Sequence, residues 1–141
     1  MSEPKSIPTG TRGEASLVVV STDLASEVAE REGESFPAVL STARMIALME
    51  LAASRILAPI LEPGQESVGV LVNVTHTAAT PPGARVTAHA TYTGRERKFH
   101  AFDVVASDAG GEIGRGIHHR AIVDGRRLIE GAEKRTRRSS T

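Results

Sequence analysis

The chain has 141 residues, which suffice for one domain. Its 40% hydrophobic content allows a substantial core, and because only 3% of residues are aromatic, this core must consist of aliphatic side chains. The 17 basic and 17 acidic residues give a formal net charge of zero, which argues against nucleic acid as a partner because phosphate binding needs a basic excess. The absence of cysteine excludes thiol catalysis, disulfides and cysteine-based metal sites. The chain also lacks an 18-residue apolar run and a signal-peptide segment, which predicts a cytoplasmic protein with no membrane partner.

The first third of the chain contains one predicted strand between less regular segments. Residues 1–12 hold proline and glycine among polar residues, which is typical of a flexible N-terminal arm. Residues 15–21 (ASLVVVS) are rich in β-branched side chains and predict a strand. Residues 24–32 have a mixed, acidic character, and we expect either a short helix or a loop there.

The strongest helical pattern covers residues 42–57. Ser41 or Thr42 can cap its amino end with a hydroxyl, and Pro59 lies beyond its last turn. Apolar residues cover nearly every face of this helix, which is typical of a helix buried on most sides. A helix of this kind needs a large element around it.

Four strands are predicted in the second half of the chain, at residues 67–77, 85–93, 99–107 and 112–123. The turns between them are short, with no helical crossover, so we expect an antiparallel meander of successive strands. In the second of them, Val86, Ala88, Ala90 and Tyr92 share one face. These elements predict an α+β fold in which an antiparallel sheet wraps around one long central helix.

We expect the domain itself to span residues 13–130, followed by a basic, disordered tail at residues 131–141. Gly114 and Gly116 lie two apart on one face of the last strand, which indicates close approach of another backbone or of a ligand.

Glu50 is the chemical anomaly of the sequence, since it interrupts the apolar run of the central helix. An unpaired buried carboxylate is costly, so such a residue usually has a partner or a function. The alternative explanations are an ion pair with a basic residue such as Arg120, or exposure to solvent.

His76 and Thr42 each have a structural and a functional explanation. His76 ends an apolar strand beside a predicted turn, where a histidine is often incidental but can also act as a general acid or base. Thr42 can simply cap its helix, or its hydroxyl can act where the helix amino end concentrates N–H groups and partial positive charge.

Other chemistries find little support. The histidines lack metal-ligand spacing, and His118 and His119 point to opposite sides of their strand. No Gly-x-Ser-x-Gly motif of a Ser-His-Asp hydrolase occurs, and no glycine-rich phosphate loop opens a helix.

Several stretches resemble the fluoroacetyl-CoA thioesterase family. Residues 36–50 are similar to the family's central helix and the segment before it. Residues 61–64 (LEPG) and 74–83 (VTHTAATPPG) are also similar, and the second stretch is long and unusual. Further similarity lies at Asp108, residues 112–114, Gly116, His118 and residues 120–121. The resemblance spans roughly residues 13–130.

This resemblance implies a hot-dog fold and a homodimer with active sites at the subunit interface, and it leaves open whether dimers pair into tetramers. The family's catalytic threonine, glutamate and histidine fall on Thr42, Glu50 and His76. Gly69 matches a backbone position near the thioester, and Arg120 matches a basic residue near the substrate entrance. No metal or separate cofactor is implied, because coenzyme A enters as part of the acyl-CoA substrate.

One departure concerns the aromatic lid, which has two phenylalanines in the namesake of the family. This chain has Phe36, a candidate substrate-binding residue, at one place and Gly33 at the other. The resemblance therefore implies hydrolysis of a short-chain acyl-CoA, with fluoroacetyl-CoA as a candidate, but it does not imply selectivity for the fluorinated group.

The expected mechanism starts with polarisation of the thioester carbonyl by the helix amino end. Glu50 then attacks to form a transient anhydride, or Glu50 or His76 activates water, and the sequence does not choose between these routes. Thr42 would hydrogen-bond to Glu50 or take part in acyl transfer, and His76 would transfer protons.

Two other functions fit the sequence less well than thioester hydrolysis does. Hot-dog enoyl-CoA hydratases share an aspartate followed shortly by a histidine, and this chain has no aspartate between Asp23 and Asp103. A non-catalytic acyl-CoA-binding protein would not need all three of the polar residues Thr42, Glu50 and His76.

Overall fold

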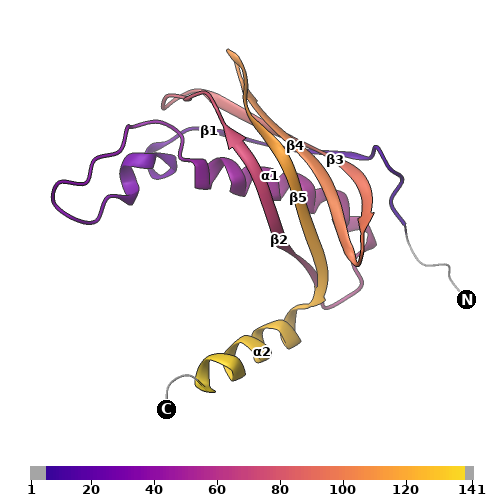
Figure 1. Ribbon diagram of the computed structural model, residues 1–141. Coiled ribbons are helices and arrows are strands. Elements are labelled where there is room, and N and C mark those ends of the chain that lie inside the picture. The colour runs from indigo at the N-terminus through magenta and orange to yellow at the C-terminus, as the bar shows by residue number, and fades with distance from the viewer. Residues whose placement is uncertain (1–5, 139–141) are drawn as a thin grey trace, which may run out of the picture.

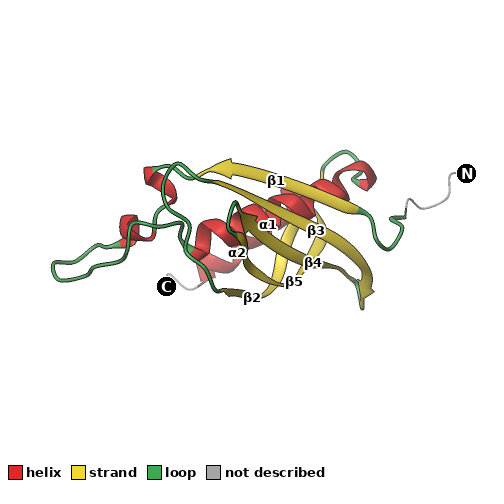
Figure 2. Cartoon of the chain, turned by 90° about the horizontal axis from the view of Figure 1, so that it is seen from above, coloured by secondary structure: helices red, strands yellow, loops and turns green. Residues whose placement is uncertain are grey.

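A computed structural model describes residues 6–138 as five strands and two α-helices. The five strands form one curled antiparallel sheet, and helix α1 lies against the face around which the sheet curls (Figures 1 and 2). The strands are β1 (Arg12–Val18), β2 (Gln65–His76), β3 (Arg85–Glu96), β4 (Phe99–Asp108) and β5 (Gly111–Asp124), and the helices are α1 (Thr42–Leu57) and α2 (Gly125–Arg138). Short 3₁₀ turns occupy Ser21–Asp23, Ala25–Val28 and Ala58–Ile60.

The strand order in the sheet is β1-β3-β4-β5-β2. The predicted meander is confirmed for β3, β4 and β5, but the prediction that β2 belongs to it is wrong. Strand β2 pairs with β5, from Gln65 opposite Asp124 to His76 opposite Gly114, and it lies at the edge of the sheet. Alternating hydrophobicity determines which face of a strand is buried but not which strand lies beside it, so the pattern could not exclude this crossover.

The core forms between α1 and the concave face of the sheet. The predicted alternation in β3 is confirmed, because Val86, Ala88, Ala90 and Tyr92 are all buried. Alanines on the sheet let the helix approach closely, and Phe102 and Val104 of β4 complete the contact. The buried face of α1 consists of Met45, Leu48, Met49, Ala52, Ala53, Ile56 and Leu57.

The opposite face of α1 remains open in the single chain, although it is also apolar. Ala43 and Ala47 are exposed, and Leu51 is 42% exposed. The prediction that this helix is buried on most sides is therefore wrong for a single copy of the chain.

The amino end of α1 is capped by Ser41, whose hydroxyl accepts a hydrogen bond of 3.0 Å from the Arg44 N–H. This contact decides between the two cap candidates and leaves the Thr42 hydroxyl available for other contacts. Pro59 lies in the 3₁₀ turn after Leu57, where the α-helix ends as predicted.

Replacement of Ser41 by Ala should lower the free energy of unfolding by about 1 kcal/mol, because one N–H of the first helical turn loses its acceptor. Chemical denaturation of Ser41→Ala and wild type measures the difference. The exposed Ser35→Ala serves as a control, and equal stability of Ser41→Ala and wild type would rule out the cap.

Gly114 and Gly116 permit close approach of backbone and helix, as their spacing predicts. A Cβ at Gly114 would lie 2.5 Å from the Thr75 carbonyl oxygen and 2.8 Å from Met45 Sδ. A Cβ at Gly116 would overlap the backbone of β2. The two glycines therefore accommodate β2 and α1.

Both predicted terminal segments are more ordered than their composition indicates. Within the arm, the N–H of Gly10 donates 2.8 Å to the Tyr92 carbonyl, and Ile7 packs against the core. The expected disordered tail is helical up to Arg138, since Asp124 Oδ1 accepts from the Arg127 N–H at the start of α2. The rest of both segments, residues 1–5 and 139–141, lies outside the described residues.

Two buried histidines make the stability of the fold sensitive to acid. Burial lowers the pKa of His100 and of His118 from the usual 6.5, so the unfolded chain binds more protons than the folded chain once the pH falls below about 6.5. Stability should therefore decline from pH 7 toward pH 5. Thermal unfolding across this range tests the expectation, and the decline should be smaller in His100→Gln. A melting temperature that does not change with pH would contradict it.

Candidate active site

Thr42 and His76 meet at the amino end of α1. Thr42 Oγ1 lies 2.8 Å from His76 Nδ1, although 34 residues separate them in the chain. The first turn of α1 presents the hydroxyl, and the last residue of β2 presents the imidazole. Because the helix amino end carries partial positive charge, a carbonyl oxygen at this place would be polarised.

His76 Nε2 is the unusual atom of this pair. It is buried and has no hydrogen-bond partner among the described residues. Since a buried polar atom without a partner costs roughly 1–3 kcal/mol, such an atom usually marks a missing partner or a site of chemistry.

Asp23 holds the segment that leads into this helix end. One of its carboxylate oxygens accepts 3.0 Å from Arg44 Nε, and the other accepts 2.8 Å from the N–H of Val20. Its carbonyl accepts from the N–H of Ser41. These bonds fix the position at which Thr42 begins the helix.

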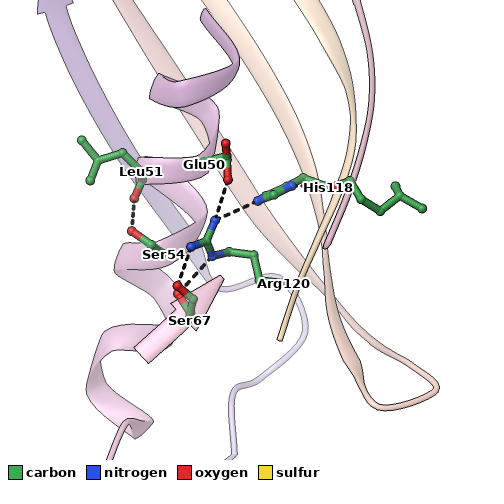
Figure 3. Close-up of polar contacts among 7 residues, drawn as sticks. Glu50, Leu51, Ser54, Ser67, His118 and Arg120 are labelled. Atoms are coloured by element: carbon green, nitrogen blue, oxygen red, sulfur yellow. Dashed lines mark hydrogen bonds and ion pairs between the residues drawn. The ribbon is translucent and has the colours of Figure 1, made fainter. Parts of the chain in front are cut away.

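Glu50 lies in a second polar cluster, two helical turns further along α1 (Figure 3). Its Oε2 accepts a hydrogen bond of 3.2 Å from Arg120 Nη1. The ion pair that the sequence offered as an alternative explanation is therefore present. The Glu50 side chain nevertheless remains 38% exposed, and within residues 6–138 no hydrogen bond or ion pair occupies its Oε1.

Arg120 is held by β2 as well as by Glu50. Its Nε donates 3.0 Å to Ser67 Oγ, and its Nη2 donates 2.9 Å to the Ser67 carbonyl. Only 7% of the residue is exposed, and burial lowers the pKa of its guanidinium, which Glu50 opposes. Arg120 is thus buried beside Glu50 in the single chain, and its place near a substrate entrance stays a prediction.

His118 completes the second cluster. Its Nδ1 lies 2.8 Å from the Leu71 carbonyl oxygen, and its Nε2 lies 3.1 Å from Arg120 Nη1. Burial is the main cause that lowers the pKa of His118, and the Leu71 bond opposes it. The imidazole is therefore neutral near pH 7.

Gly69 provides the space that Glu50 occupies. A Cβ at this position would lie 2.5 Å from Glu50 Oε2 and 3.1 Å from His118 Cε1. In this structure, then, Gly69 faces the carboxylate of Glu50.

Gly69→Ala should displace the Glu50 carboxylate and, for the acyl-CoA hydrolysis that the resemblance implies, lower kcat on acetyl-CoA by on the order of a hundredfold, because small misplacements of reacting groups are costly. The fold should survive, since the carboxylate can move toward solvent. Thiol release and thermal unfolding measure the two effects. Gly110→Ala, on the turn between β4 and β5, is a matched control, and unchanged kcat in Gly69→Ala would contradict the prediction.

Within one chain, the three predicted catalytic residues form two sites and not one. Thr42 and Glu50 are eight residues apart on one helix, which separates them by about 12 Å along its axis. The expected hydrogen bond from Thr42 to Glu50 is therefore wrong for the single chain, where Thr42 contacts His76 instead.

A hollow of about 300 Å³ adjoins the first pair and is lined by Thr42, His76, Pro37 and Val39 among others. Phe36 is exposed on the segment before it and is not among the lining residues. Gly33, in the place of a second lid aromatic, has a φ of +90°, a backbone conformation that favours glycine.

The sequence did not single out two residues of these clusters, Asp23 and His118. Their signal was weak, since one lies in an irregular segment and the other in a strand beside a second histidine.

Residues 6–138 hold no group of three or more acidic or histidine side chains that could bind a metal ion, and none of their helices is long and apolar enough to cross a membrane.

Comparisons with known proteins agree with this architecture. A family profile of fluoroacetyl-CoA-specific thioesterases matches residues 20–126. The fluoroacetyl-CoA thioesterase of Streptantibioticus cattleyicolor is 47% identical over 92 residues, which are 65% of this chain and 66% of that protein, slightly less than two thirds of its length.

Solved structures extend the likeness to the whole fold. The fluoroacetyl-CoA thioesterase FlK is 36% identical with a TM-score of 0.86, covering 92% of this chain and 98% of that one. A hypothetical protein of the thioesterase superfamily from Thermus thermophilus is 28% identical with a TM-score of 0.83, covering 95% and 96%.

The curled sheet around a central helix places this chain in the hot-dog fold class, and the chain is similar to the thioesterases of known structure described above. Within that class, the chain belongs to the fluoroacetyl-CoA-specific thioesterase family.

Proposed function

We propose that this chain hydrolyses short-chain acyl-CoA thioesters as a homodimer, with each active site formed by Thr42 and His76 of one copy and Glu50 of the other. The observation that carries the proposal is the buried His76 Nε2, which has no partner among the described residues. Glu50 of the same chain is about two helical turns away from Thr42, whereas a second copy can supply an acceptor.

Two neighbouring surfaces support a second copy of this chain as the partner. Strand β2 has one unpaired edge, and Val70, Leu71 and Val72 on it are 44%, 39% and 42% exposed. The open face of α1 adds Ala47 and the exposed Leu51. An unprotected apolar edge strand is a template for pairing, and pairing of β2 with its own copy would extend the sheet across a two-fold axis.

The same two-fold symmetry favours the shared site. Two α1 helices that cross in opposite directions bring residues on either side of the axis into contact. The midpoint between Thr42 and Glu50 is residue 46, and Ile46 lies on the open side of α1, only partly buried. An axis near Ile46 therefore sets the amino end of one helix beside Glu50 of the other copy.

In this arrangement the groups divide the reaction between them. The Thr42 hydroxyl donates a hydrogen bond to His76 Nδ1, so that Nε2 carries the hydrogen and donates a hydrogen bond to the carboxylate of Glu50 from the other copy. The helix amino end polarises the thioester carbonyl. Glu50 attacks the carbonyl to form an anhydride that water then hydrolyses, or Glu50 takes a proton from a water molecule that attacks the carbonyl directly. In both routes the carbon–sulfur bond breaks, and His76 transfers a proton to the leaving thiolate.

The acyl groups that we propose are small, with acetyl and fluoroacetyl groups among them, because the relatives are fluoroacetyl-CoA thioesterases. Phe36 is the proposed acyl contact, and Gly33 leaves its lid with one aromatic, so we expect similar kcat/KM for fluoroacetyl-CoA and acetyl-CoA. The cytoplasm is the proposed location, since CoA thioesters are intracellular metabolites. Coenzyme A is part of the substrate, and no further cofactor is proposed.

Mixing two inactive variants tests the shared site. Glu50→Gln and His76→Ala are each purified, unfolded together in equal amounts and refolded, and thiol release from acetyl-CoA is measured. A mixed dimer has one site with both native groups, and half of randomly formed dimers are mixed, so about one quarter of wild-type activity should return. Separately refolded variants are the control.

The outcomes separate the parts of the proposal. An inactive mixture in which native mass spectrometry detects mixed dimers would show that each site lies within one chain. A monomer at assay concentrations would exclude the shared site. Binding of acetyl-CoA by the wild type without thiol release would exclude hydrolysis and favour a binding protein.

A further inference from the structure

The second polar cluster contains a buried histidine, His118, that the proposed mechanism does not use. His118 is only 1% exposed, yet both of its ring nitrogens have partners. A buried imidazole with two partners is held in one orientation and in one tautomer.

The partners determine that tautomer. The Leu71 carbonyl can only accept, so His118 Nδ1 carries the hydrogen and donates to it over 2.8 Å. Since arginine can only donate, the remaining nitrogen of the ring, Nε2, accepts from Arg120 Nη1 over 3.1 Å. His118 thus connects the edge strand β2 to the guanidinium of Arg120 (Figure 3).

Arg120 divides the two N–H groups of its Nη1 between His118 Nε2 and Glu50 Oε2. Its Nε donates to Ser67 Oγ, and one N–H of its Nη2 donates to the Ser67 carbonyl. Glu50 therefore receives one hydrogen bond from Arg120 and not the paired, two-bond contact that arginine often makes with a carboxylate.

Gly69 of β2 lies beside both Glu50 and His118. The register of β2 shifts between Gly69 and Leu71, so the His118 bond to Leu71 holds the strand at this irregularity. Gly69 just before it faces both the Glu50 carboxylate and the His118 ring. The imidazole therefore contacts both Arg120 and strand β2, which lie beside Glu50.

We infer that His118 is a positioning residue of the thioesterase, which engages one N–H of Arg120 Nη1 and so directs the other N–H to a single oxygen of Glu50. This inference rests on the proposed catalytic role of Glu50. Without His118, Arg120 stays bonded to Ser67, but one Nη1 N–H loses its acceptor, so the guanidinium can tilt toward Glu50 and donate to it more strongly, which would reduce the basicity and nucleophilicity of the carboxylate.

Two substitutions at His118 distinguish positioning from packing. His118→Phe fills the ring volume beside Phe102 but lacks both hydrogen bonds. His118→Gln offers one donor and one acceptor at a similar spacing, so it can restore both contacts. His119→Phe, the neighbouring residue on the opposite side of β5, is the matched control.

Steady-state kinetics on acetyl-CoA with thermal unfolding provide the measurement. We expect kcat of His118→Phe to fall by roughly tenfold to a hundredfold with little change in KM, and His118→Gln and His119→Phe to stay within about threefold of wild type. In the Glu50→Gln background, His118→Phe should cause no further loss, because its effect passes through Glu50. If His118→Phe does not fold, His118→Met takes its place, since methionine adapts to irregular buried space.

Other outcomes would overturn the inference. Wild-type kcat in a folded His118→Phe protein excludes positioning, and so does a loss of equal size in the Glu50→Gln background. Loss of kcat in His118→Gln to the level of His118→Phe also excludes it, since both hydrogen bonds can form there. If Glu50→Gln alone keeps its activity, the proposed function itself fails, which is a different result from failure of the positioning role.

Discussion

Glu50→Gln should lower kcat on acetyl-CoA by roughly a thousandfold, because the amide keeps the shape of the side chain but can neither attack nor accept a proton. The fold should survive, since the amide oxygen can still accept from Arg120 and the side chain is partly open to solvent. Thiol release and thermal unfolding measure both effects.

Glu14→Gln is the matched control for this substitution. Glu14 also forms an ion pair, with His89 at 3.1 Å, but it lies on β1 and is exposed. The kcat of Glu14→Gln should equal that of wild type. Near-normal turnover in Glu50→Gln would remove Glu50 from the mechanism and with it the proposed site.

His76→Ala should also lower kcat by roughly a hundredfold to ten-thousandfold, the usual contribution of a general acid or base. The substitution removes the partner of the Thr42 hydroxyl and the group proposed to protonate the leaving thiolate. His76 lies at the end of an edge strand, so the melting temperature should change little. Thiol release from acetyl-CoA gives kcat.

His89→Ala controls for the loss of an imidazole, since His89 is a partly exposed histidine paired with Glu14 on the outer part of the sheet. Its kcat should match wild type. Turnover of His76→Ala within a few-fold of wild type would mean that the Thr42–His76 contact is structural.

Elements with a strong local pattern could be predicted from the sequence. Helix α1 begins and ends where its cap and Pro59 indicate, and the alternation in β3 identifies the face that packs on it. Both patterns depend on neighbours a few residues away, which the sequence displays directly. Glu50 stood out for the same reason, as a carboxylate within an apolar helix.

Features that depend on contacts between distant segments could not be predicted. Nothing in the pattern of β2 indicates that it pairs with β5, and this pairing is what brings Ser67 and Gly69 beside Arg120. One local feature was missed as well: residues 131–138 are helical although their low hydrophobicity resembles disorder, and a hydrogen bond from the Arg127 N–H to the Asp124 side chain holds the start of α2.

The chemistry divides in the same way. The sequence by itself predicts the candidate catalytic residues Thr42, Glu50 and His76, because side-chain type and resemblance to a family are properties of the chain. Only the tertiary structure decided which residues these side chains contact. It places Thr42 Oγ1 2.8 Å from His76 Nδ1, and Glu50 Oε2 3.2 Å from Arg120 Nη1. The physical reason is that a helix separates residues eight positions apart, whereas pairing of strands can join residues from any two parts of the chain.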